Sequence, residues 1–476
     1  MVSALNEDRL FPTDPEQRSI ARRLYEAIKD RPIISPHGHV PIDWFAEDKH
    51  FKNPTDLFIT PDHYVTRIMH GHSVPFSELG VGQKNFTEEQ SRNAFRLLGK
   101  YWYAYAGTPM RYWMEDSLSN VFGINKPLNE DTADSIYDEL NELLASDDFT
   151  TRKLVKRFNI GFISTTDDPT DDLALHDKVR ADANFPARLA PCFRPDRYLA
   201  VDRVDWAQLC DQLGESAGVS TATYEGFVEA MRRRRLFFKQ HGAVAADYGV
   251  DSSLDEVNWS GDTTRLSDDE AIRLYTKARS GSLTSDEARK LHAHLLNDQA
   301  KLAQDDGLVM TMHPGVMRNH YRKQLVNYGP DCGADCPMPA DWAHWLRPML
   351  NEYGENPDFH LVAFTMDETA YSRELAPMAA YYPALYIGAP WWFLDAPEPI
   401  LRYYEDVVPY AGFAKLSGFI DDTRALCSIP ARHDMNRRLT ARYISGLVAD
   451  HRLSYEEGEQ IAIRSVDGQP SDVFKL

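Results

Sequence analysis

Short apolar runs alternate with amphipathic stretches along most of the chain. The runs show little polar alternation, which is typical of parallel strands covered on both faces. The stretches between them repeat apolar residues at helical spacing. Eight such strands with helical crossovers predict an α/β fold, a (β/α)8 barrel of the TIM type. The predicted strands are residues 33–35, 160–165, 188–193, 243–247, 308–313, 360–365, 384–388 and 415–420.

Helical patterns fill the long stretches between these strands. Residues 14–30 repeat apolar positions every three to four residues, and Asp14-Pro15 supplies an N-cap and a first-turn proline. Residues 41–158 predict a large helical insertion after the first strand, and residues 215–306 a mostly helical segment interrupted by one barrel strand. The 476 residues allow one large domain or two. We predict a single barrel domain over residues 1–476.

The chain carries a strong negative charge. Its 52 Lys and Arg stand against 72 Asp and Glu, which gives a formal net charge of -20. This balance argues against nucleic acid and anionic membrane surfaces as partners, and an anionic substrate would need cations gathered locally. The first residues lack the basic start and apolar run of a secretion signal, and no apolar run is long enough to span a bilayer.

The cysteines indicate a reducing compartment. There are five, an odd number, and only Cys332 and Cys336 lie close together, which argues against a disulfide framework. We therefore expect a cytoplasmic protein. Cys332 and Cys336 could form half of a zinc site, but no second pair with finger-like spacing follows. A solvent loop is the favoured interpretation.

Two histidines follow the first predicted strand. His37 and His39 are two residues apart, and side chains at that spacing on a strand point the same way. Both imidazoles could therefore converge on one divalent ion at about 2 Å. The pattern is short, so a pair of surface histidines is the alternative interpretation.

Other ligand-type and cationic residues stand where later strands end, which is where barrel enzymes place their chemistry. They are Arg194 after the third strand, Asp247 at the end of the fourth, His313 at the end of the fifth, and Asp422 and Arg424 after the eighth. Alone, His313 would suit a core histidine and Asp422 a helix N-cap. Together with the histidine pair, Asp422 would give three metal ligands and an open fourth position, typical of a catalytic site. Nearby arginines would make the cleft cationic, which predicts an anionic substrate.

Several longer motifs contain these residues or stand between them. In this order and spacing, over nearly the whole chain, they resemble the uronate isomerases of the amidohydrolase superfamily. The resemblance implies interconversion of D-glucuronate with D-fructuronate and of D-galacturonate with D-tagaturonate. The motifs are Pro36-His37-Gly38-His39, Asp62-His63-Tyr64, Thr165-Thr166-Asp167-Asp168-Pro169, Phe193-Arg194-Pro195-Asp196, Met312-His313-Pro314-Gly315, Trp391-Trp392-Phe393, Asp422-Thr423-Arg424 and Ser428-Ile429-Pro430-Ala431-Arg432-His433.

The resemblance also implies roles for individual residues. The metal ligands correspond to His37, His39 and Asp422, which would hold one divalent ion, with zinc as the expected metal. The remaining active-site set corresponds to Tyr64, Arg194, Asp247, His313 and Arg424. One departure is that the chain has Asp247-Tyr248 where the family tends to have Asp-His.

An aldose–ketose isomerisation moves a proton from C2 to C1 through an enediol. Asp422, ionised beside a metal, is the predicted base at C2, and Tyr64 could relay protons between O1 and O2. Arg194 or Arg424 would grip oxygens or the distal carboxylate, in an order that the sequence leaves open. His313 could hydrogen-bond a substrate hydroxyl.

Some of these residues could instead have purely structural roles. Tyr64 could be a packed aromatic residue, and Asp247 a carboxylate that orients a neighbour or one that contacts substrate. Trp392 is counted among the substrate-binding residues, and a pocket wall or core position is favoured for it over stacking on a sugar.

Two other functions fit the same pattern. The first is a mononuclear metal-dependent hydrolase on the same barrel, although no lysine ends the third, fourth or fifth strand to bridge two metals. The second is a non-catalytic protein that binds acid sugars. For partners, we predict a small anionic sugar acid and a homo-oligomer, with no nucleic acid and no membrane.

Overall fold

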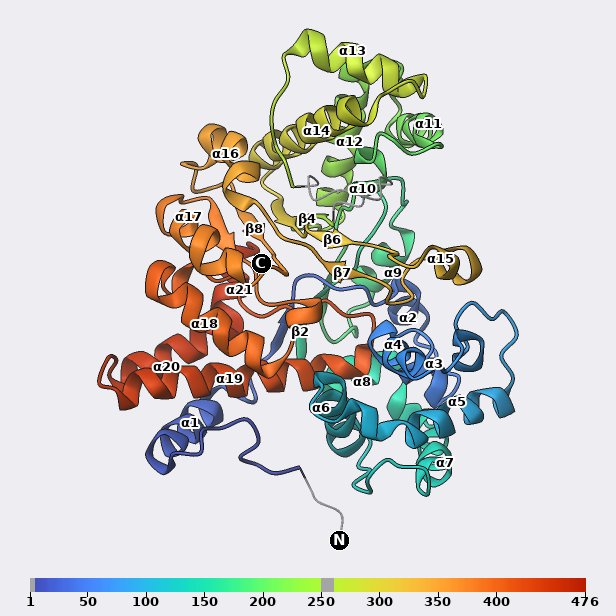
Figure 1. Cartoon of the computed structure of the whole chain (residues 1–476), viewed down its shortest axis with the longest axis vertical. Coiled ribbons are helices and arrows are strands. Elements are labelled where there is room, and N and C mark those ends of the chain that lie inside the picture. The colour runs from blue at the N-terminus through green and yellow to red at the C-terminus, as the bar shows by residue number, and fades with distance from the viewer. Residues whose placement is uncertain (1–4, 250–260) are drawn as a thin grey trace.

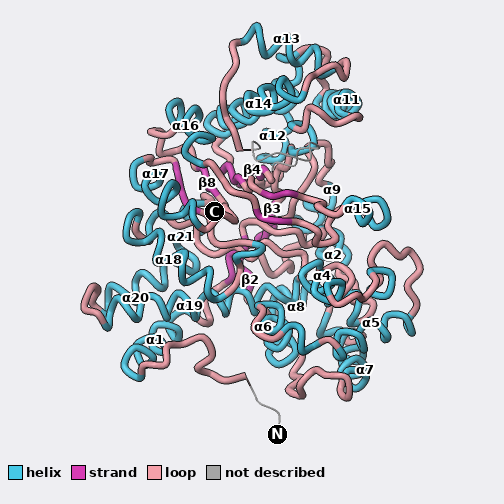
Figure 2. Tube along the Cα trace, viewed as in Figure 1, coloured by secondary structure: helices cyan, strands magenta, loops and turns pink. Residues whose placement is uncertain are grey.

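Parallel strands run through the middle of the molecule, with helices around them (Figure 1, Figure 2). The computed structural model describes residues 5–249 and 261–476, so residues 250–260 of the predicted segment 215–306 lie outside the described residues. The first parallel sheet has the order β1 (Ile33–Ser35), β2 (Ile160–Ser164), β3 (Arg188–Ala190). The second has the order β4 (Ala245–Tyr248), β5 (Val309–Met312), β8 (Leu361–Ala363), β9 (Leu385–Ile387). A short antiparallel pair is formed by β6 (Val316–Met317) and β7 (Cys336–Pro337).

Single backbone bridges connect the first sheet to the second. Phe193, three residues beyond β3, forms parallel bridges with Asp167 on one side and with Ala246 of β4 on the other. The Asp247 amide donates to the carbonyl of Phe193 at 2.9 Å. The seven strands of the two sheets therefore follow one another in chain order, each beside the next, from β1 to β9.

The predicted eighth strand is irregular. Leu416 forms a parallel bridge with Ile387 of β9, but no strand is assigned within residues 415–420. Gly418 has φ +80°, outside the extended region, and ends the straight path of the chain there. The other seven predicted strands are confirmed with ends that differ by up to three residues, and the mixed α/β class with parallel strands is confirmed.

Helices fill every long connection, as the apolar spacing predicts. Residues 41–158 contain seven α-helices, and the described part of the chain from 206 to 306 contains four α-helices with β4 among them. The helices are α1 (Pro15–Ile28), α2 (Ile42–Glu47), α3 (Pro54–Phe58), α4 (His63–Gly71), α5 (Glu88–Lys100), α6 (Pro109–Asp116), α7 (Ala133–Leu144), α8 (Thr151–Arg157), α9 (Ala174–Ala181), α10 (Asp196–Leu199), α11 (Trp206–Ala217), α12 (Tyr224–Gln240), α13 (Asp268–Arg279), α14 (Ser285–Asp306), α15 (Arg322–Tyr328), α16 (Trp342–Tyr353), α17 (Ala376–Tyr381), α18 (Pro397–Ala411), α19 (Ile429–Ala449), α20 (Tyr455–Ile463) and α21 (Gln469–Val473). None of the described helices is long and apolar enough to cross a membrane.

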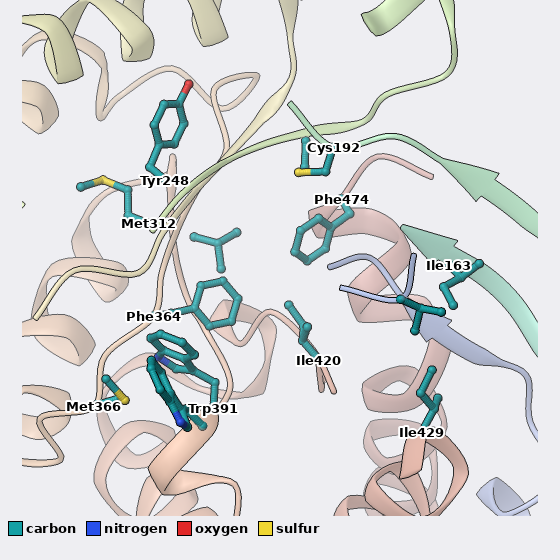
Figure 3. Close-up of a cluster of buried hydrophobic side chains, with 14 of the residues drawn as sticks. Ile163, Cys192, Tyr248, Met312, Phe364, Met366, Trp391, Ile420, Ile429 and Phe474 are labelled. Atoms are coloured by element: carbon teal, nitrogen blue, oxygen red, sulfur yellow. The ribbon is translucent and has the colours of Figure 1, made fainter. Parts of the chain in front are cut away.

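Side chains from the strands and the loops after them form one buried apolar cluster. Ile163 of β2, Met312 of β5, Phe364 after β8 and Ile420 of the irregular segment all belong to it (Figure 3). Cys192 lies in the same cluster, and all five cysteines are free thiols. This core holds the carboxyl ends of the strands at fixed positions.

A buried ion pair ties α12 to the end of α14. Nε of Arg235 lies 2.6 Å from Oδ2 of Asp306, and the Arg235 side chain is 0% exposed. Nη1 of the same arginine donates to the Tyr248 hydroxyl at 2.7 Å. Tyr248 is thus part of this buried network.

We expect Asp306→Ala to destabilise the protein by about 3–5 kcal/mol, because it leaves the guanidinium of Arg235 buried without a counter-charge. Asp305→Ala is the matched control: its side chain is 52% exposed and pairs with Lys301 at the surface, so a loss of about 0.5 kcal/mol or less is expected. Urea unfolding of both variants measures the difference. Equal midpoints would show that the buried pair is not a determinant of stability.

Candidate active site and metal centre

The three predicted metal ligands come together beyond the ends of the strands. His37 and His39 follow β1, and Asp422 follows the irregular segment 415–420. Oδ1 of Asp422 lies 3.3 Å from Nε2 of His37 and 3.0 Å from Nε2 of His39. The His39 amide donates to the carbonyl of Thr423 at 3.0 Å, which holds the two loops side by side. Sequence positions almost four hundred residues apart thus share one small volume.

His313 and Asp247 lie directly behind this group. Nδ1 of His313 is 2.8 Å from Oδ1 of Asp247, and Oδ2 of Asp247 is 3.8 Å from Nε2 of His37. Thr311 donates its hydroxyl to Oδ1 of Asp247 at 2.7 Å. His37, His313 and Asp422 each offer a ligand atom within 4.8 Å of the others, so His313 is a further candidate ligand.

The charges of the cluster favour a cation. Burial opposes ionisation of Asp422, but His37 and His39 hold its pKa well below the usual value. Burial also opposes ionisation of Asp247, but His37, His313 and Arg194 together hold the pKa of this carboxyl well below its usual value. Both carboxylates are therefore ionised at neutral pH.

Several buried polar atoms of the cluster lack hydrogen bonds. Within the described residues, Nε2 of His313 is buried with no hydrogen-bond partner, and Oδ1 of Asp422 and Oδ2 of Asp247 have ion-pair neighbours but no hydrogen bond of good geometry. Buried polar atoms are almost always paired, so this grouping needs a ligand to satisfy it. Imidazole nitrogens beside carboxylate oxygens form the donor set that divalent transition metals prefer, so the residues fit such an ion.

The cluster opens into a pocket of about 720 Å³, within the range of small-molecule sites. His39 and Asp422 line it, whereas Asp247 and His313 are absent from its described lining and sit behind the floor. The other predicted site residues that line it are Tyr64, Arg194, Trp392 and Arg424.

Tyr64 is placed by the start of α4. Asp62 caps this helix by accepting a hydrogen bond from the Tyr64 amide at 2.9 Å. The Tyr64 ring stacks on His63 with centroids 4.7 Å apart and meets Trp113 edge-on at 5.8 Å. Burial raises the pKa of the Tyr64 phenol above its usual value, so the hydroxyl carries its proton at neutral pH.

The two predicted arginines occupy different parts of the pocket. Nε of Arg194 donates to Oδ2 of Asp196 at 2.7 Å, and its Nη1 lies 3.4 Å from Oδ2 of Asp247, beside the metal cluster. Nη2 of Arg424 lies 3.4 Å from Oδ2 of Asp331, and its side chain is 37% exposed. Arg194 is therefore the inner cation and Arg424 the outer one.

The pocket also contains residues to which the sequence analysis gave no role. His63 lines the wall, and burial, with Arg424 close by, lowers its pKa to about 3, so its imidazole is neutral. The guanidinium of Arg318 lies 4.9 Å from the ring of Trp392, and Asp331 stands near both arginines. His63 could have been found from its place beside Tyr64 in the motif. Nothing in the sequence around Asp331 distinguishes it from a loop aspartate.

Left-handed backbone conformations gather around the pocket. Such φ values are uncommon for residues with side chains and concentrate at functional sites, where the surrounding structure holds them. The lining residues with this geometry are Asn319 (φ +54°), Asp331 (φ +62°), Trp392 (φ +51°) and Asp422 (φ +41°).

The chain matches proteins of a known family along nearly its whole length. A sequence model of the glucuronate isomerase family matches residues 11–463. The chain belongs to the glucuronate isomerase family. It is 47% identical to a uronate isomerase of Cutibacterium acnes over 472 residues, which cover 99% of this chain and 98% of the relative.

Two solved structures of the family share the fold. The glucuronate isomerase of Caulobacter crescentus superposes with a TM-score of 0.94 at 37% identity, covering 99% of this chain and 97% of that one. The uronate isomerase of Thermotoga maritima gives a TM-score of 0.90 at 27% identity, covering 99% and 100%. The resemblance noted in the motifs is confirmed, and the chain is an isomerase.

We expect Asp247→Asn to weaken divalent-metal binding about 10–100-fold, because the variant removes a charge that faces His37 and His313 from behind. Equilibrium dialysis against zinc, followed by elemental analysis, measures this change. Asp167→Asn, another buried pocket carboxylate but one that pairs with Thr165 and His176, should bind zinc as the parent does. Equal zinc affinity in all three proteins would remove Asp247 from the metal environment.

Proposed function

We propose that the chain interconverts D-glucuronate with D-fructuronate and D-galacturonate with D-tagaturonate. The observation that carries this proposal is the carboxylate of Asp422, set beside His37 and His39 at a pocket whose lining includes Arg194 and Arg424. An ionised carboxylate beside a cation-binding group suits proton abstraction next to a carbonyl. The arginines suit an anionic sugar.

We assign His37, His39 and Asp422 as the ligands of one divalent ion, with zinc as the metal. An ion held there would act as a Lewis acid on the oxygens of the reacting carbons. The His313 ring contacts Asp247, so we assign it to that pair or to the metal rather than to a substrate hydroxyl.

The proton transfers fall to Asp422 and Tyr64. Asp422 removes the proton from C2 of the open-chain aldose, and the electron pair of that bond forms the C1–C2 double bond of an enediol. Asp422 then returns a proton to C1. Tyr64 donates its phenolic proton to O1 and accepts the proton of O2, so the aldehyde and the C2 alcohol become a C1 alcohol and a C2 ketone.

The arginines bind opposite ends of the substrate. Arg194 lies beside the metal cluster, where its fixed charge would stabilise negative charge on the oxygens of the enediol. Arg424 lies in the outer pocket, where a planar guanidinium suits the distal carboxylate. Trp392, whose ring centroid lies 5.5 Å from that of His63, lines the same pocket.

We also propose that the strands close into a barrel. The bridge from Leu416 to Ile387 and the hydrogen bond from His39 to Thr423 support a ring of strands closed as a (β/α)8 barrel. One apolar cluster with members from β1 to α21 supports a single domain over residues 1–476, with residues 41–158 as an insertion. We further propose that the protein forms a homo-oligomer and is located in the cytoplasm.

Incubation with D-glucuronate in heavy water tests the reaction. We expect ketose with deuterium at C1, because a carboxylate exchanges its proton with solvent before returning one. ¹H and ²H NMR follow the product. Lactones and esters, assayed in parallel, test for the rival hydrolase. Complete retention of the original hydrogen would leave hydride migration open beside internal return of the same proton, and hydrolysis without isomerisation would contradict the proposed function.

Asp422→Asn should lower kcat by at least about 10³-fold, because an amide cannot accept the proton from C2. Asp168→Asn is the control, since Asp168 also lines the pocket but pairs with Arg197. Circular dichroism and zinc content show whether fold and metal persist. A folded, zinc-loaded Asp422→Asn enzyme with parental kcat would exclude Asp422 as the base.

A further inference from the structure

Arg432 lies behind the pocket wall, in the first turn of α19. It is 0% exposed. Its Nη1 donates to Oδ2 of Asp395 at 2.8 Å and to the carbonyl of Asp421 at 3.3 Å, and its Nε donates to the Ser428 hydroxyl at 3.1 Å. One guanidinium thus joins α19 to the loops that follow β9 and the irregular segment 415–420.

The same guanidinium also contacts the helical segment that carries Tyr64. Its central carbon lies 3.6 Å from the ring centroid of Trp113 and 5.0 Å from that of Tyr64. A guanidinium over an aromatic face is attracted by the ring, more strongly where water is excluded. Because the Tyr64 and Trp113 rings meet edge-on, the cation sits at their junction and restricts the orientation of the phenol.

The hydrogen bond to the Asp421 carbonyl acts on Asp422. This carbonyl belongs to the peptide that joins the two residues, and Asp422 has the uncommon φ of +41°. The next residue of α19 helps to hold the same loop, since Nε2 of His433 lies 3.1 Å from Oδ2 of Asp421. Both contacts restrain the backbone next to Asp422 and therefore the direction of its side chain.

We propose that Arg432 is a positioning residue that sets the Tyr64 hydroxyl relative to the Asp422 carboxylate. The inference rests on the proposed function, in which these two groups move the protons of one reaction. Effective proton transfer requires both groups to stay within hydrogen-bond reach of neighbouring substrate atoms, and displacements near 1 Å can lower rates about 10²-fold. Tyr64 and Asp422 lie on segments far apart in sequence, and Arg432 contacts both segments.

An arginine suits this task better than other side chains. Its planar fork donates in fixed directions while its face packs on an aromatic ring. A lysine would keep the charge but would lose the fork, and a methionine would keep the volume but lose both. The chemistry therefore predicts graded effects for Arg432→Lys and Arg432→Met.

The first test is steady-state kinetics of the zinc-loaded full-length protein with D-glucuronate. Arg432→Met should lower kcat at least about 30-fold, with KM and zinc content within about threefold of the parent. Arg432→Lys should recover part of the loss.

Arg438→Met is the matched control for these variants. This arginine lies on the same helix, is nearly as buried, and pairs with Asp434 at 2.8 Å, away from the residues that line the pocket. It should lower the unfolding midpoint and leave kcat unchanged.

The second test is a double-mutant cycle with Tyr64→Phe, which keeps the ring and removes the hydroxyl. The relative placement of two groups has a chemical consequence only while both are present. Adding Arg432→Met or Arg432→Lys to Tyr64→Phe should therefore lower kcat by less than about threefold further. Losses that multiply in full would show that Arg432 acts independently of Tyr64 and would overturn the proposal.

The outcomes separate this inference from the proposed function. Absence of isomerase activity in the parent protein contradicts the proposed function itself. An active parent whose Arg432→Met and Arg432→Lys variants keep the parental kcat contradicts only the role of Arg432. If Arg432→Met does not fold, the double-mutant cycle with Arg432→Lys tests in the same way whether the effect of Arg432 depends on Tyr64.

Discussion

The site depends on one contact between distant parts of the chain, the approach of the Asp422 loop to the His37–His39 loop. Two ionised carboxylates lie here among imidazoles, Asp247 fully buried and Asp422 nearly so, and a buried charge without compensation costs several kcal/mol. The backbone hydrogen bond from His39 to Thr423 fixes the spacing of the loops. The imidazoles and a bound cation would together compensate the charge of the two carboxylates.

The charge of the whole protein shapes the pocket as well. A chain with a net charge of -20 uses its own carboxylates to hold the pocket arginines, Asp196 and Asp247 for Arg194 and Asp331 for Arg424. These pairs fix the guanidinium groups at the pocket, whose described lining holds as many aspartates as arginines, so a cation bound at the histidines would add the positive charge that a sugar acid needs. An anionic sugar can still bind inside an acidic protein because short-range contacts with individual arginines dominate inside the pocket and distant charges are screened.

Much of the fold could be predicted from the sequence because buried parallel strands leave uninterrupted apolar runs. The exception was residues 415–420: the run is apolar enough for a strand, but a positive φ at Gly418 is a backbone property that composition does not reveal. For the site, the residues after the strands pointed to His37, His39 and Asp422. The pairing of His313 with Asp247 and the presence of Asp331 depend on loop paths in three dimensions, which no local pattern specifies.

The central claim is that His37, His39 and Asp422 share one cation, and anomalous diffraction from crystals of the zinc-loaded protein tests it most directly. Data collected above and below the zinc absorption edge locate the metal without reference to activity. The account predicts one strong peak at about 2.0–2.2 Å from Nε2 of His37, Nε2 of His39 and a carboxylate oxygen of Asp422. A zinc peak held elsewhere, or bound to the histidines with Asp422 turned away, would contradict it.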